Sequence, residues 1–468
     1  MNVIAIMIIL PLIALLAEIA LSKRYSLTIV SISTFIMLAI VSYLLVVGFI
    51  HGSILVAQSY AYIIAPSISI SLYLNIASLM LLLMASVVLF VASISGNIGA
   101  ERAKLSSALM LLFQLAATGI FTSGTLIQFF IFWDIGVITA FVMINTLGTA
   151  SSKKASMTFL IYEIFASAML LFAILLIYFG TPLHTFNIQA IISGSNSMPV
   201  SAQGLIFFFM ALAFMVNMPL FPFHSWLPGA YAEASTQGSM ALAGILSKFG
   251  AFGLLLTFEM LPIASHYSIY VAGLAIVSSI YASIVMLSQT DIKRIIAYAA
   301  MVEMGIIALG ISAFNVFGTY GALYGMLAQG LTIAFMFLIA GAIVFEFGER
   351  DMRLLKGVIA NAKASAYSLV VGVLALSGLP LTSGFIADLL IFIGAYKSFS
   401  IYGLVPLFAI ILMVAYMYYL LNKSVLSSRD RNWNVAYLGV SQKIGYGIFI
   451  AFIFVFGILP FVLLNMVH

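Results

Sequence analysis

The chain has 468 residues, of which only 7% are charged: 18 Lys and Arg against 13 Asp and Glu. Hydrophobic residues make up 64% of it, and an average soluble domain carries roughly 25% charged residues. The composition therefore excludes a soluble enzyme and predicts an integral membrane protein. The absence of cysteine excludes disulfides, Fe–S clusters and thiolate metal sites.

Continuous apolar runs follow one another along the chain, each of about 20 residues, which is typical of membrane helices rather than barrel strands. The run from Met1 has no basic segment before it and ends at Lys23 and Arg24, so it is predicted to be a span and not a signal peptide. We expect an all-α protein with about 14 transmembrane helices, at residues 3–21, 26–50, 71–95, 105–122, 125–148, 156–179, 203–219, 236–259, 268–289, 295–313, 317–345, 364–396, 401–422 and 444–467. The outer stretch 180–202 is predicted to be a surface loop with a short interfacial piece.

The basic residues support this span count. If alternate loops are cytoplasmic, 16 of the 17 Lys and Arg residues outside the spans lie on the cytoplasmic side, and Lys397 alone lies on the other side. One span more or fewer would move every later loop to the opposite side of the membrane, and the basic residues would no longer lie on one side. The net charge of +5 then reflects topology rather than nucleic-acid binding, and both termini are predicted outside.

Ionisable side chains inside a span are costly unless paired or hydrated, and by default they mark an ion or proton path. Three lie in the middle of spans: Asp134 in FFIFWDIGVITAF, Lys248 in ALAGILSKFGAFGLL and Asp388 in SGFIADLLIFIG. The alternative for each is an ion pair that only holds two helices together. Lys248 is the most informative, because lysine, unlike arginine, can release its proton inside a protein. Moving a carboxylate near it would switch its proton affinity.

Three further acids lie within or near the ends of spans. Glu163 and Glu303 fit a role in a path and a structural role about equally. Glu18 lies a turn from Lys23, at the inner end of the first span, where a surface ion pair is the expected arrangement.

Proline and glycine interrupt two of the predicted spans. Proline removes a helix hydrogen bond, and irregular backbone persists inside a membrane only where protein or a water-filled cavity satisfies it. The pattern predicts broken helices, with a simple proline kink as the alternative. The interruptions are NMPLFPFHSWLP at 217–228, with Pro219, Pro222 and Pro228, and GLPLTSGF at 378–385, with Gly378, Pro380 and Gly384.

The two interruptions fall in spans 7 and 12, which cross the membrane in opposite directions because they are five spans apart. This arrangement predicts two inverted five-helix repeats, spans 4–8 and 9–13. The chain then divides into an N-terminal segment (1–104), a first repeat (105–260), a second repeat (261–422) and a C-terminal helix with its connecting loop (423–468). His224 lies beside the first interruption, in an expected inner loop, and either relays protons or bonds the exposed backbone there.

Three sequence blocks resemble those of one family. PFHSWLPGAYAEASTQGSMALAGILSKFGAFGLL, SQTDIKRIIAYAAMVEMGII, and GERDMRLLKG with SGLPLTSGFIADLLIF are similar to the antiporter-like membrane subunits of respiratory complex I (NADH–quinone oxidoreductase). Subunits of membrane-bound hydrogenases and multi-subunit sodium/proton antiporters belong to the same family. The resemblance covers roughly residues 105–425 and implies 14 helices with two inverted repeats. It also implies a prokaryotic cell membrane, other membrane subunits as partners and no cofactor in this chain.

In such subunits protons move through a central row of charges, which the resemblance places on Asp134, Lys248 and Asp388. Glu303 adds a charge near the middle of the row. The chain departs from the family pattern at Asn217, where a lysine is usual, and at Gln329, where a histidine is common. Without the lysine, Asp134 is expected to be neutral for much of the time or to pair with Lys248 instead. His224, Glu163, Asn217 and Gln329 are the accessory candidates.

Three functions fit these features. The first is a proton-translocating subunit of a complex I-like oxidoreductase, driven by redox chemistry in partner subunits. The second is an Mrp-type cation/proton antiporter subunit without a redox partner, and the third is a degenerate structural subunit. Neighbouring genes or co-purified redox subunits would separate the first two. The sequence fits NADH, F420, ferredoxin or hydrogen as the electron donor alike, and H⁺ or Na⁺ as the coupling ion.

Overall fold

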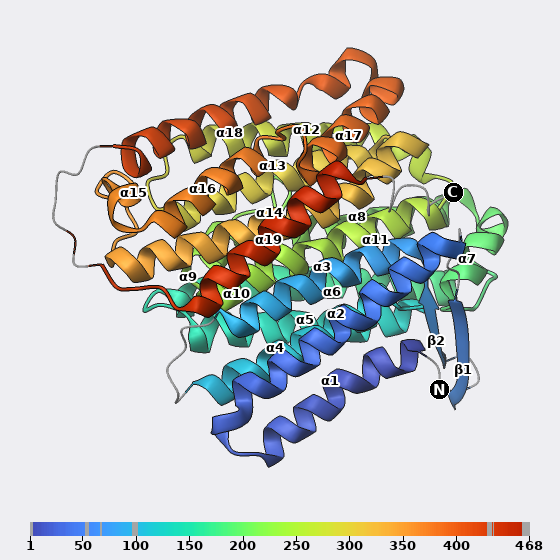
Figure 1. Cartoon of the computed structure of the whole chain (residues 1–468). Coiled ribbons are helices and arrows are strands. Elements are labelled where there is room, and N and C mark those ends of the chain that lie inside the picture. The colour runs from blue at the N-terminus through green and yellow to red at the C-terminus, as the bar shows by residue number, and fades with distance from the viewer. Residues whose placement is uncertain are drawn as a thin grey trace.

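A computed structural model describes residues 3–51, 56–65, 68–95, 102–427, 433 and 435–460. Fourteen of its helices are long and apolar enough to cross a membrane. They lie side by side in one bundle (Figure 1). The predicted helical class and the predicted span count are therefore confirmed.

The first six spans lie close to their predicted positions. Helix α3 is the most enclosed of them, with 94% of its apolar window buried. Polar caps begin two helices: Asn75 accepts a hydrogen bond from the Ser78 amide and Thr125 accepts one from the Gln128 amide. The six are α1 (Val3–Ala20), α2 (Ser26–His51), α3 (Ile76–Ile94), α4 (Ala103–Phe121), α5 (Leu126–Leu147) and α6 (Ser152–Gly180), with a short turn, η1 (Lys23–Tyr25), between the first two.

The third span begins five residues later than predicted, because residues 71–74 belong to a β-hairpin. Strand β1 (Val56–Ala65) pairs antiparallel with β2 (Ile68–Leu74), and Val56 lies opposite Leu74. The sequence ISISLYL of β2 alternates apolar and polar residues, a period typical of strands. Mean hydropathy alone hid this alternation inside the predicted span.

The rest of the chain contains the other eight spans and several short helices. The predicted interfacial piece in 180–202 is α7 (Ile188–Gly194), followed by η2 (Ser195–Ser197). The spans and their extensions are α8 (Val200–Asn217) with α9 (Leu227–Glu233), α10 (Thr236–Ala241) with η3 (Leu242–Leu246) and α11 (Ser247–Met260), α12 (Ala264–Met286), α13 (Ile292–Ser312), α14 (Val316–Phe347), α15 (Val358–Asn361) before α16 (Lys363–Leu376), α17 (Ser383–Phe399) with η4 (Ser400–Leu404), α18 (Leu407–Leu420) with η5 (Leu421–Val425), and α19 (Val440–Ile458).

Both predicted helix breaks are present. Nine residues separate α8 from α9, and six separate α16 from α17. Gly378, in the second break, has a φ of 62°, a left-handed conformation that glycine adopts without strain. Helix α8 leaves α7 at one end of the bundle and α16 leaves α15 at the other, so the two run in opposite directions (Figure 1). The five-helix repeats and the division into four parts stay predictions.

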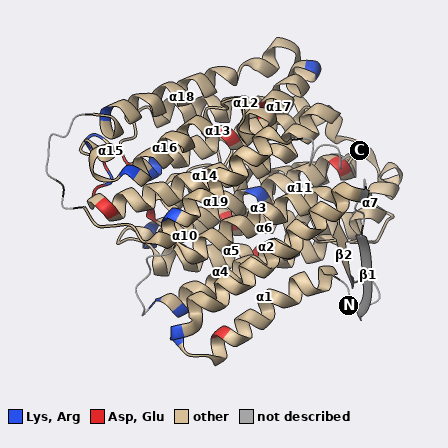
Figure 2. Cartoon of the chain, viewed as in Figure 1, with Lys and Arg blue, Asp and Glu red and all other residues tan. Residues whose placement is uncertain are grey.

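The charged residues are distributed unevenly along the bundle. Most Lys and Arg residues lie at the end away from the N and C labels (Figure 2). Helix α1 begins and α19 ends at the opposite end (Figure 1), as an even number of spans requires. We call the first of these ends the basic end. A few charged positions remain in the middle of the bundle, and these concern the candidate site (Figure 2).

Candidate functional site

The first group of buried polar residues lies where α5, α6 and α8 meet. Asn217, the last residue of α8, donates from Nδ2 to both carboxylate oxygens of Glu163, at 3.2 and 3.1 Å. Both residues are completely buried. The amide oxygen of Asn217 accepts a hydrogen bond from the Gly250 backbone at 2.9 Å. Asn217 therefore joins α6 to α11 and does not contact Asp134 through a hydrogen bond.

Gly250 makes this contact possible. A Cβ atom at this position would lie 2.7 Å from the Phe214 carbonyl oxygen and 3.0 Å from Oδ1 of Asn217. Real Cβ atoms do not approach a backbone oxygen so closely. The sequence KFGAFG thus brings α11 against α8 two residues after Lys248.

Asp134 is held by a short chain of hydrogen bonds. The Ser167 hydroxyl donates to its Oδ1 at 2.7 Å, and that hydroxyl accepts from the indole of Trp133 at 3.2 Å. In the described part of the chain Asp134 makes no ion pair, so of the two alternatives for this residue the pairing with Lys248 is not present. Ile131 and Ile138, one turn away on either side, are 51% and 58% exposed. Asp134 therefore lies near a face that lipid or another protein must cover.

Aromatic rings fill the space where α4, α5, α8 and α11 meet. The ring of Phe249, next to Lys248, contacts those of Phe113 and Phe121 at 6.0 and 5.6 Å between centroids. A Cβ at Gly136, two residues after Asp134, would lie 2.8 Å from the Phe249 ring. Helices α5 and α11 therefore meet through rings and not through charges. The aromatic cluster consists of Phe113, Phe121, Phe129, Trp133, Phe214, Phe249 and Phe252.

Lys248 is fully buried and bonded to neutral groups. Its Nζ donates to the Ala243 carbonyl at 2.6 Å and to the Ser247 hydroxyl at 3.2 Å. Ala243 belongs to the π-helical turn η3, and such turns inside α-helices are frequent at functional sites. Among the described residues no carboxylate lies within 4.0 Å of Nζ. Lys248 is thus in electrostatic range of Glu303 but forms no ion pair with it.

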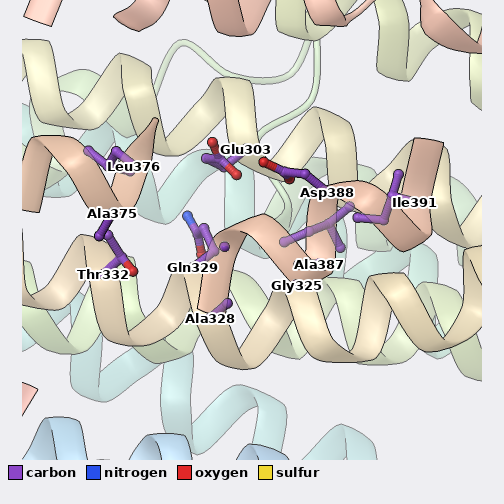
Figure 3. A pocket seen from close by; sticks show the side chains of 12 residues that line it. Glu303, Gly325, Ala328, Gln329, Thr332, Ala375, Leu376, Ala387, Asp388 and Ile391 are labelled. Carbon is purple, nitrogen blue, oxygen red and sulfur yellow. The ribbon is translucent and has the colours of Figure 1, made fainter. Parts of the chain in front are cut away.

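The second group surrounds a small cavity of about 20 Å³ at the second helix break. Glu303 of α13, Asp388 of α17 and Gln329 of α14 line it, with Ala375 and Leu376 from the C-terminal end of α16. Glu303 and Asp388 point toward each other, and the amide of Gln329 is directed at Glu303 (Figure 3). We call this space the α13–α17 cavity.

Polar atoms in the α13–α17 cavity lack partners. Both Nε2 and Oε1 of Gln329, and Oε1 of Glu303, are buried without a hydrogen-bond partner. Glu303 lies in electrostatic range of Lys248 on one side and of Asp388 on the other. The structure thus brings together three of the four residues predicted for the central row, and leaves Asp134 with the first group.

His224 lies within the first helix break, in the non-helical stretch between α8 and α9 that follows the end of the seventh span at Asn217, and its place on the inner side stays a prediction. Its ring stacks on Phe221 at 5.7 Å and meets the Tyr281 ring at 4.7 Å. The ring atom Nδ1 is buried without a partner, so it does not bond the exposed backbone. Pro219 and Pro222 belong to the same break, whereas Pro380 belongs to the second break and Gly384 to the first turn of α17.

The expectation for Glu18 is wrong. Its side chain is 1% exposed, and both carboxylate oxygens are buried without a partner. The reason is that α1 packs on α4, where Lys104 donates to the carbonyls of Ile19 and Leu21 at 3.1 Å each. Lys23 remains exposed and does not reach it.

Sequence reasoning missed an ion-pair network at the basic end. Arg350 contacts Asp291 at 2.8 Å and Glu233 at 3.4 Å, and Thr149 also donates to Glu233. Glu233 ends α9 whereas Arg350 follows α14, so the network ties the predicted halves together. The charged sequence blocks QTDIKR and GERDMR contain Asp291 and Arg350, and could have indicated this network. In the same loop the Arg353 guanidinium beside Asp351 holds the pKa of that carboxyl below its usual range.

A second cavity, of about 210 Å³, opens near the basic end. Ser95, Gln237 and Gln442 line it, together with the first residues of α10. Gln237 precedes Lys248 by 11 residues, or about 17 Å along the helix axis. We call this space the basic-end cavity. In the described ranges no group of three or more His, Cys, Asp or Glu side chains could hold a metal ion.

Comparison with known proteins shows to which family the chain belongs. The family model described as NADH:quinone oxidoreductase/Mrp antiporter, transmembrane, matches residues 123–414. This chain belongs to that family. The NADH-quinone oxidoreductase subunit M of Rickettsia bellii (strain RML369-C) is 33% identical over 369 residues, covering 76% of this chain and 73% of that one.

Other members of the NADH:quinone oxidoreductase/Mrp antiporter family are also similar. The F(420)H(2) dehydrogenase subunit M of Methanosarcina mazei (strain ATCC BAA-159 / DSM 3647 / Goe1 / Go1 / JCM 11833 / OCM 88) is 29% identical over 368 residues, covering 76% of this chain and 74% of that one. A chain of respiratory complex I from Thermus thermophilus, solved with bound NADH, superposes with a TM-score of 0.89. It is 22% identical and the match covers 99% of this chain and 97% of that one. That likeness shows that the two chains share a fold.

Proposed function

We propose that this chain is a proton-translocating, antiporter-like membrane subunit of a complex I-like oxidoreductase. The observation that carries the proposal is Lys248, fully buried in mid-span, bonded only to neutral acceptors and in electrostatic range of Glu303. A buried lysine in this state can gain and lose a proton as nearby charges change. The family includes both oxidoreductase and Mrp antiporter subunits. The named relatives, an NADH-quinone oxidoreductase subunit M and an F(420)H(2) dehydrogenase subunit M, support this function over a stand-alone antiporter.

The proposed path begins at the basic end and crosses to the other side through the second group. Protons enter through the basic-end cavity, which Ser95 and Gln237 line, and reach Lys248 along the α10–α11 helix. Glu303 then takes the proton from Lys248 and passes it to Asp388 across the α13–α17 cavity. Asp134, Glu163, Asn217 and His224 form the accessory side of the path, which biases Lys248 through the Asn217 contact with α11.

The chain itself carries no cofactor in this proposal. Redox chemistry in partner subunits supplies the energy, and another membrane subunit covers the α5 face at Asp134, since Ile131 and Ile138 leave that face exposed. We place the protein in a prokaryotic cell membrane, with the basic end in the cytoplasm and both termini outside, from the positive-inside rule.

Substitution of Lys248 by alanine in the assembled complex tests the proposal. We expect the number of protons translocated per electron to fall by the whole share of this subunit, while the complex still assembles and oxidises its donor. The measurement is proton uptake or release by vesicles per electron transferred.

Lys397→Ala is the matched control, since Lys397 is exposed at the other end of the bundle and lies over the Phe317 ring at 3.8 Å. It should keep the wild-type ratio. An unchanged ratio in Lys248→Ala would reject the proposed path.

A further inference from the structure

A large apolar groove lies between α6, α8 and α12, and its lining is distinct from the two groups of buried polar residues. Its volume is about 770 Å³, within the roughly 300–1,000 Å³ of small-molecule sites. Phe165 of α6 and Phe208 of α8 line it and are exposed, so it opens on the outside of the bundle. All three helices are long and apolar enough to cross a membrane. The groove, which we call the α8–α12 groove, therefore opens to the lipid hydrocarbon.

Small side chains on α8 make the groove deep. Gly204 and Ala211 both line it and are seven residues apart, which places them on one side of the helix. The floor is buried and apolar, formed by Phe207 and Met215 of α8 and Val271 of α12. Among the described residues no charged side chain lines the groove. Water finds no polar partners along such a floor, and cavities of this composition stay dry.

The two ends of the groove differ in character. Where α8 and α12 begin, Tyr267 and Tyr270 of α12 line it, and the Tyr267 ring is fixed by stacking on Phe207 at 5.2 Å between centroids. Tyrosine is typical of the level at which lipid head groups meet the hydrocarbon. At the other end, Pro222 and Phe223 of the first helix break line it. The groove thus leads from the head-group level toward the first break.

The width of the groove decides between a helix and a hydrocarbon chain as its occupant. Gly204 and Met215 both line it and are 11 residues apart, about 17 Å along α8. A volume of about 770 Å³ over that length gives a mean cross-section of about 45 Å². A helix of about 10–12 Å diameter needs about 80–110 Å². A transmembrane helix of another subunit therefore does not fit into the groove, whereas the thinner hydrocarbon chain of a lipid does.

We propose that the α8–α12 groove binds the hydrocarbon chain of a membrane lipid, whose head group lies at Tyr267 and Tyr270. The chain lies along α8 and ends against Phe223. Its end meets a fixed surface, because the backbone N–H of Phe221 in the same break donates to the Ser278 hydroxyl of α12 at 3.2 Å. With no charge in the lining, the groove recognises the chain and not the head group. The inference is independent of the proposed proton path.

Photocrosslinking of the purified, assembled complex in phosphatidylcholine nanodiscs tests the inference. The probe is a phosphatidylcholine with a diazirine in one acyl chain, and peptide mass spectrometry identifies the labelled residues. We expect labelling of the buried residues Met215 and Val271 to saturate at a low fraction of probe. Labelling of Ile411, an exposed residue of α18 that contacts bulk lipid, should rise in proportion to the probe. A phosphatidylglycerol probe with the same chain should give the same result.

Two variants fill the groove from opposite sides. Ala211→Phe does so from α8 and Leu274→Trp from α12. Each should lower labelling of the floor by roughly tenfold, because the space for the chain is gone. Ala415→Phe is the matched control, since Ala415 is exposed on α18, outside the groove. It should leave labelling of the floor unchanged. Elution of each variant as an intact complex, with unchanged labelling at Ile411, shows that the loss is local.

Three results would overturn the proposal. Floor labelling that rises in proportion to the probe, as at Ile411, would show ordinary contact with bulk lipid. An unlabelled floor in wild type would show that another subunit covers the groove. Equal floor labelling in Ala211→Phe, Leu274→Trp and wild type would place the bound chain elsewhere.

Discussion

Asn217 is the residue at which this chain departs most from the family pattern, and the structure gives it a different partner from the one expected. A lysine there would carry a positive charge to the first group. The asparagine instead satisfies both oxygens of Glu163 and the Gly250 amide with one neutral side chain. The first group therefore contains two acids and, within the described chain, no basic residue in contact with them.

Removing this amide should be costly. Asn217→Leu leaves the Glu163 carboxylate and the Gly250 amide buried without partners, and we expect a loss of about 1–3 kcal/mol in the stability of the complex for each group left unpaired. Thermal unfolding of the purified complex measures it. The double variant Asn217→Leu, Glu163→Leu should recover part of the loss, because no carboxylate then lacks a donor. A double variant that is less stable than the single one would contradict this account.

The sequence predicted the central residues themselves but not their partners. A charged residue within an apolar run can be recognised from the sequence without any knowledge of the fold. This is how Asp134, Lys248 and Asp388 were found. Hydrogen bonds such as Ser167 to Asp134 depend on how two helices are rotated against each other. The partner of Glu18 was mispredicted for the same reason. Its position one turn from Lys23 predicted an ion pair, but the packing of α1 against α4 prevents that pair.

At the level of helices, close packing between α8 and α11 sets the geometry around Lys248. Gly250→Ala would place a Cβ 2.7 Å from the Phe214 carbonyl oxygen, so α8 and α11 must separate. We expect this variant to lose about 1–3 kcal/mol of stability, as overpacked interiors do, and most of its proton translocation. Both are measured on the assembled complex, by thermal unfolding and by protons translocated per electron.

Gly273→Ala is the control for that substitution. Gly273 also lies in a membrane helix, α12, but a Cβ there meets no atom within 4 Å. The variant should keep full translocation and gain slightly in helix stability, by up to about 1 kcal/mol. If both alanine variants behaved alike, close packing of α8 on α11 would not be the cause.

The spans could be predicted because a continuous run of about twenty apolar residues indicates a membrane helix. The breaks were predictable too, since Pro219 and Gly378 fall inside such runs. The π-turn η3 was not, because nothing in the sequence LAGIL distinguishes it from an ordinary helix. The β-hairpin was missed because a hydropathy average over twenty residues conceals an alternation over seven.

At the scale of the whole molecule, the orientation in the membrane can be tested by labelling introduced cysteines. The chain has no cysteine of its own, so an introduced one is the only thiol in it. Lys153→Cys at the basic end and Lys397→Cys at the other end both replace exposed residues. In intact cells a membrane-impermeant maleimide should label only the variant at 397, and in inside-out vesicles only the variant at 153. The reverse pattern would place the termini in the cytoplasm and contradict the positive-inside assignment.

The aromatic cluster between α5 and α11 has a consequence for leakage. Its rings offer no chain of donors and acceptors along which a proton could hop, and the one indole N–H among them, on Trp133, is already bonded to Ser167. The cluster therefore leaves no direct proton route between the first group around Asp134 on α5 and Lys248 on α11.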